Sequence, residues 1–125
     1  MKKEKNIKRL INSFKYAFEG IINTYKTEQN IIIHTIIAII VIIFGILFKI
    51  NIYEWIICIV LFGLVISAEL FNTAIESIVD LNCKSYNKYA KIAKDSSAGA
   101  VLILALTSVI IGCIIFLPKI FQVLN

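Results

Sequence analysis

Four side chains with a carboxylate or amide group recur at helical spacing within the mostly apolar stretch of residues 67–80. They are Glu69, Asn72, Glu76 and Asp80. At about 100° per residue these positions fall on one side of a helix, so the stretch predicts a membrane helix that carries carboxylates down one face. Neighbouring carboxylates repel one another, and ionisable groups inside a membrane segment are costly enough to suggest a function. The face therefore needs a cation, either a divalent metal ion or a lysine from elsewhere in the chain.

This acidic face has the composition of a site for phosphoryl transfer. Mg²⁺ is typically bound by one or two protein carboxylates together with substrate phosphates, so acids near the cytoplasm could hold Mg-ATP. Lys94 could balance the phosphate charge, and Glu69 could accept the proton of a hydroxyl group. The sequence contains neither a Gly-Lys-Ser/Thr phosphate-binding loop nor the catalytic loop of protein kinases. A kinase of this sequence would therefore use a different architecture.

Long apolar stretches indicate that a membrane domain presents this face. Of the 125 residues, 59% are hydrophobic, which is more than a soluble domain normally contains. A helix needs about 20 apolar residues to cross the hydrocarbon core. We expect an all-α integral membrane protein with one domain over residues 1–125 and spans at 31–49, 53–80 and 96–118, the second extending into the cytoplasm. Ser96 or Ser97 is the expected cap of the third helix.

Residues 5–26 show the pattern of an amphipathic helix. Apolar residues recur there at intervals of three and four, and the opposite face is mostly basic. A basic amphipathic helix next to a span typically lies in the plane of the membrane interface, with its cations near anionic lipid. We therefore expect residues 5–26 to lie on the membrane surface.

The distribution of positive charge predicts the orientation of the chain. Seven of its 13 lysine and arginine residues precede the first span, and four more lie between the second and third spans. By the positive-inside rule, the N-terminus and the connector of residues 81–95 should face the cytoplasm of a multi-pass protein in the cell membrane. We expect no cleaved signal peptide, since the first apolar run begins only at residue 31. The basic residues suit lipid headgroups or nucleotide phosphates, and no aromatic-interleaved basic patch indicates nucleic acid.

Two motifs resemble the signature of the prokaryotic diacylglycerol kinase family. Residues 69–80 read ELFNTAIESIVD, and residues 93–101 read AKDSSAGAV. They match the family patterns E-x-x-N-[ST]-A-I-E-x-x-V-D and A-K-D-x-[AGS]-[AS]-[AG]-A-V. The surface helix, the three spans and the chain length agree as well. The resemblance implies a homotrimeric lipid kinase whose active sites are built at subunit contacts.

The resemblance also implies a role for each residue that matches the motifs. Glu69 would be the general base toward the lipid hydroxyl, and Glu28 and Glu76 would hold Mg²⁺. The nucleotide and its phosphates would be positioned by Asn72, Glu76, Asp80, Lys94 and Asp95. Only the resemblance implies a role for Glu28, since a carboxylate in the polar link before the first span would otherwise be interpreted as solvated.

The family that the sequence resembles divides into branches with different lipid substrates. Gram-negative members of the family phosphorylate diacylglycerol, whereas Gram-positive members act largely on undecaprenol. Residues 14–21, FKYAFEGI, and the spacing of Glu28, Asn30 and His34 are more similar to the Gram-positive branch. Undecaprenol is therefore the favoured acceptor, with diacylglycerol as the alternative. A lone histidine one turn inside a span is more often an interfacial residue than a catalyst, although His34 could orient a neighbouring carboxylate.

Two other classes of function also fit an acid in a membrane helix. A small proton-coupled transporter could use Glu69 as its proton site, but it would not need the further acids or the Lys94-Asp95 pair. A non-catalytic assembly protein could use the acidic face for salt bridges between helices. ATP-dependent product formation without a gradient would distinguish a kinase from both.

Overall fold

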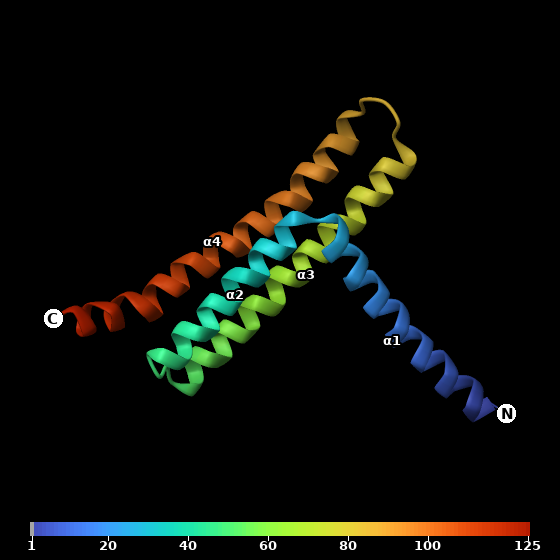
Figure 1. Ribbon diagram of the computed structural model, residues 1–125. Helices are drawn as coiled ribbons and strands as arrows, with labels where there is room; N and C mark the ends of the chain where they lie inside the picture. The colour runs from blue at the N-terminus through green and yellow to red at the C-terminus, as the bar shows by residue number, and fades with distance from the viewer. Residues whose placement is uncertain (1) are drawn as a thin grey trace.

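The chain folds into a helical bundle with one helix directed away from it (Figure 1). The computed structural model describes residues 2–125, with side chains from Lys5 onward. Its elements are α1 (Lys2–Thr27), α2 (Gln29–Leu47), α3 (Ile52–Asn82) and α4 (Lys88–Leu124). In the described range no strand occurs, which confirms the expected all-α class.

Three of these helices, α2, α3 and α4, are long and apolar enough to cross a membrane. At 1.5 Å per residue, the 31 residues of α3 and the 37 residues of α4 extend over about 46 and 55 Å. Both lengths exceed a hydrocarbon core of about 30 Å. Figure 1 shows the α3–α4 hairpin continuing past the junction of α1 and α2. Part of α3 and α4 therefore extends beyond the apolar bundle on that side.

The α2–α3 turn is fixed by local polar contacts and by one close aromatic contact. Asn51 caps α3 in a reciprocal pair of hydrogen bonds with Glu54, whose other oxygen accepts a bond of 2.7 Å from Lys119 of α4. A Cβ atom at Gly45 would lie 2.7 Å from the Trp55 ring. Glycine is needed here because any side chain would collide with the indole. This packing sets the register of α2 against α3.

The last turn of α1 holds the start of α2 in place. Thr24 is buried, and the Tyr25 hydroxyl lies 2.6 Å from Thr35 Oγ1 on α2. The rest of α1 runs crosswise to the bundle (Figure 1), and its apolar residues, Phe14 and Phe18 among them, are exposed. Such a helix can lie along a membrane surface, as expected for residues 5–26.

The start of α4 differs from the expected cap. Asn87 caps this helix, its Oδ1 accepting hydrogen bonds from the backbone N–H groups of Tyr89 at 2.8 Å and Ala90 at 3.2 Å. The prediction that Ser96 or Ser97 would cap it was wrong, because the helix begins about two turns earlier, in a segment rich in lysine. Both serines lie inside α4, which also continues past Pro118 to Leu124.

Candidate active site

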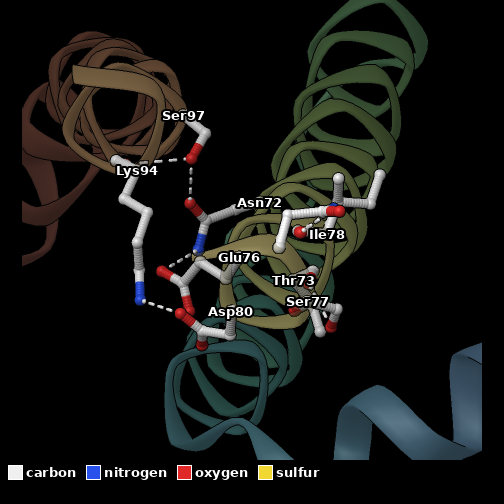
Figure 2. A network of polar contacts seen from close by, with 9 residues as sticks. Asn72, Thr73, Glu76, Ser77, Ile78, Asp80, Lys94 and Ser97 are labelled. Atoms are coloured by element: carbon white, nitrogen blue, oxygen red, sulfur yellow. Dashed lines mark hydrogen bonds and ion pairs between the residues drawn. The ribbon is translucent and has the colours of Figure 1, made fainter. Parts of the chain in front are cut away.

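The polar face of α3 is joined to α4 by a short chain of hydrogen bonds. The Ser97 hydroxyl lies 2.7 Å from Asn72 Oδ1 and also within reach of the Lys94 carbonyl oxygen at 2.9 Å. Asn72 Nδ2 in turn donates to Glu76 Oε1 at 3.2 Å. Asn72 and Ser97 are buried, whereas Glu76 is half-buried. Figure 2 shows the three side chains in sequence between the two helices. The amide orientation is thus fixed, and so is one oxygen of Glu76.

A lysine from α4 meets the acidic face one turn further along. Lys94 Nζ donates to Asp80 Oδ1 at 2.9 Å (Figure 2). The two side chains are 38% and 65% exposed, and an ion pair in such a position stabilises a fold by about 1 kcal/mol at most. If Lys94 exchanged Asp80 for a phosphate group, the folded state would therefore lose little stability. Lys94 supplies the cation that the acidic face needs.

Glu69 lies deeper in the bundle and is 2% exposed. Its Oε1 is enclosed and has no hydrogen bond. His34 Nε2 lies 3.1 Å away, at ion-pair distance. Burial of a carboxylate without partners is costly. A carboxylate that is buried at such a cost inside a membrane helix is typically retained for function.

Glu28 and Asp95, like Glu69, lie outside this hydrogen-bonded chain. Glu28 is the N-cap residue of α2 at its junction with α1, and its side chain makes no capping bond. Asp95 instead pairs with Lys91 of its own helix, and both side chains are exposed. Glu28 and Asp95 thus make no contact with the chain of Ser97, Asn72 and Glu76 among the hydrogen bonds and ion pairs of the described residues.

The donor set suits a magnesium ion that is shared with a substrate. Between Lys5 and Asn125 no group of three or more His, Cys, Asp or Glu side chains could hold a metal ion. Mg²⁺ keeps several waters and is usually held by one or two carboxylates plus substrate phosphates. Glu28, without a side-chain cap bond, and Glu76, with one oxygen bonded to an amide, can each still offer a carboxylate oxygen. The residues fit a metal that arrives with a nucleotide.

Comparison with known proteins identifies the family. The sequence profile described as prokaryotic diacylglycerol kinase matches residues 15–116. The chain belongs to this family. It is 46% identical to an undecaprenol kinase of Bacillus subtilis over 113 residues, which cover 90% of this chain and 92% of that relative. It is also 39% identical to a diacylglycerol kinase of Synechocystis over 116 residues, which cover 92% of this chain and 66% of that relative.

Family membership confirms the resemblance that the motifs indicated, and the fold adds contacts that the motifs do not carry. Periodicity places Asn72 and Glu76 on one face, but the bond from Ser97 to Asn72 depends on how α3 and α4 are paired. The spacing of Ser97 three residues after Lys94 was the available signal, because residues three apart share a helix face. No local pattern links His34 to Glu69, since they lie on different helices.

Removal of the Ser97 hydroxyl should destabilise the bundle at the site. In Ser97→Ala the buried Asn72 Oδ1 loses its side-chain donor, which we expect to lower the free energy of unfolding by about 1–3 kcal/mol. Ser77→Ala is the matched control, because Ser77 is exposed and bonds only to the Thr73 carbonyl of its own helix. Thermal unfolding in detergent would compare the two variants. Equal losses would contradict the role assigned to Ser97.

Proposed function

We propose that this membrane lipid kinase transfers the γ-phosphoryl group of Mg-ATP to undecaprenol. Family membership supports lipid phosphorylation, and it favours a kinase over the transporter or assembly protein that the sequence alone left open. One structural observation carries the proposed site: an enclosed carboxylate, Glu69, shares α3 with the more exposed Glu76 and Asp80. A lipid hydroxyl and a nucleotide can approach this helix from the apolar bundle and from water, respectively.

In the proposed reaction Glu69 acts as the general base. It takes the proton of the lipid hydroxyl as the hydroxyl oxygen bonds to the γ-phosphorus. The bond from that phosphorus to the β–γ bridging oxygen breaks, and ADP leaves. Bound Mg²⁺ neutralises phosphate charge in such reactions, and Glu28 and Glu76 would hold it. The remaining proton on Glu69 must pass to water before the next turnover.

The nucleotide phosphates are assigned to the outer part of the same face. Lys94 would exchange Asp80 for a phosphate oxygen, and Asp95 would exchange Lys91 for a group on the nucleotide. Asn72 would orient Glu76 and contribute its amide. Phosphoryl transfer depends mainly on such positioning and charge neutralisation. A fixed amide beside a partly exposed lysine suits both tasks.

The assembly and orientation belong to the same proposal. The single chain leaves many large apolar side chains of α2, α3 and α4 exposed, which lipid and neighbouring subunits would cover. We assign a homotrimer in the plasma membrane, with the N-terminus and the α3–α4 connector in the cytoplasm, on the basis of the family resemblance and the positive-inside rule. Spans within residues 31–49, 53–80 and 96–118 then place Asp80 and Lys94 near cytoplasmic ATP.

Undecaprenol is preferred over diacylglycerol because of the relatives. The Bacillus subtilis relative named as an undecaprenol kinase has the higher identity of the two and matches this chain over nearly the whole length of both proteins. The sequence of residues 14–21 and the spacing of Glu28, Asn30 and His34 support the same choice. The alternative acceptor remains diacylglycerol, which would yield phosphatidic acid.

Parallel assays with the two alcohols test the proposal. Protein purified in detergent would receive labelled ATP, Mg²⁺ and either undecaprenol or diacylglycerol, without any ion gradient. We expect label in undecaprenyl phosphate at a higher kcat/KM than in phosphatidic acid. A preference for diacylglycerol would reverse the substrate assignment. Failure of both alcohols to accept label would refute the lipid kinase.

A further inference from the structure

The enclosed oxygen of Glu69 has no role in the reaction described above. A base needs one oxygen to take the proton, and the other must be held so that the first faces the acceptor. Glu69 Oε1 is buried without a hydrogen bond, whereas Oε2 is not enclosed in this way. A buried oxygen without a hydrogen-bond partner destabilises the folded state. A nearby donor that approaches Oε1 would remove this cost and fix the carboxylate plane.

His34 brings a polar group to ion-pair distance of that oxygen. Its Nε2 lies 3.1 Å from Glu69 Oε1, and the imidazole is 20% exposed. The ring also borders a groove of about 290 Å³ between α2, α3 and α4, whose lining is mostly aliphatic and aromatic. The lining also contains the Ser108 hydroxyl, which already donates to the Leu104 carbonyl oxygen at 2.8 Å. Glu69 is the acceptor that the structure brings within 3.1 Å of His34 Nε2.

We propose that His34 is a positioning residue for Glu69, donating its Nε2–H to Oε1 so that Oε2 faces the acceptor hydroxyl. This role rests on the proposed function of Glu69 as the base. A neutral imidazole N–H can donate to the carboxylate and to the carboxylic acid alike, so the bond persists when the proton arrives on Oε2. A permanent cation in the same place would reduce the basicity of the carboxylate. The imidazole therefore suits a base that must be protonated and released in each cycle.

Two substitutions at position 34 separate positioning from packing. His34→Leu fills much of the same space but has no donor, and we expect kcat to fall about 10- to 100-fold with the KM for ATP unchanged. His34→Gln carries an N–H at a reach similar to that of Nε2, and we expect it to recover most of the lost turnover. Ser108→Ala, which removes a hydroxyl bonded within its own helix, is the control and should keep wild-type kinetics. A wild-type kcat in His34→Leu, or a His34→Gln variant as slow as His34→Leu, would overturn the inference.

A spectroscopic measurement tests the contact without relying on turnover. His34 is the single histidine of the chain, so ¹⁵N-histidine labelling yields one imidazole spectrum. We expect the Nε2–H resonance of the wild type to shift in Glu69→Gln, because the carboxylate charge beside it is lost. If the wild-type protein is active but its His34 resonance is the same in Glu69→Gln, the positioning role is overturned and the proposed function stands. A spectrum that shifts in a protein that phosphorylates neither alcohol would instead refute the proposed function, and with it the purpose assigned to His34.

Discussion

Glu69→Gln should reduce kcat by about 10²- to 10⁴-fold, the usual contribution of a general base. The amide has nearly the shape of the carboxylate but cannot take the proton of the lipid hydroxyl. Since the wild-type oxygen is buried without a hydrogen bond, and a neutral group costs less to bury than a charge, the variant should unfold at a temperature no lower than that of the wild type. Turnover with labelled ATP and thermal unfolding in the same detergent would measure both effects.

Glu54→Gln is the matched control for this experiment. Glu54 is also a carboxylate of α3, but it lies at the opposite end of the helix and pairs with Lys119. We expect this variant to lose some thermal stability and to retain its turnover. Loss of turnover at position 69 together with gain or retention of stability would show that the site, rather than the fold, is affected. Turnover of Glu69→Gln within tenfold of the wild type would remove Glu69 from the role of base.

Helical periodicity predicted the acidic face well because it is a property of one helix. A fixed rotation per residue puts Asn72 and Glu76 on one face wherever α3 is helical. The structure adds a hydrogen bond between them. The apolar runs that become α2, α3 and α4 were equally clear, since a membrane span needs a long uninterrupted apolar segment.

Contacts between helices were the part that the sequence could not predict. The pairing of His34 with Glu69 depends on the register of α2 against α3, which close packing of Gly45 on Trp55 helps to set. The early start of α4 was also missed, because residues 88–95, KYAKIAKD, are half charged and so do not continue the apolar run of the third span. That extra length carries Lys94 to Asp80 and puts Ser97 inside the helix, where it bonds to Asn72.

Glu76→Gln should raise the Mg²⁺ concentration needed for half-maximal activity by about 100-fold. The amide oxygen can still accept the bond from Asn72 Nδ2 that Glu76 Oε1 accepts in the wild type, so the geometry of α3 is retained while one negative charge is lost. Mg²⁺ prefers carboxylate oxygens, and even outer partners of a metal site can change affinity by 10- to 100-fold. A magnesium titration at constant ATP would measure the shift.

Glu19→Gln provides the charge-matched control, because Glu19 is an exposed carboxylate on α1 beside Lys15. It should leave the magnesium curve unchanged, whereas Glu76→Gln should recover part of its turnover at high Mg²⁺. Such recovery follows if the lost carboxylate served mainly to hold the metal, since a higher Mg²⁺ concentration then fills the weakened site. A Glu76→Gln variant that is slow at every Mg²⁺ concentration, with an unshifted midpoint, would instead assign Glu76 to the orientation of Asn72 and the nucleotide.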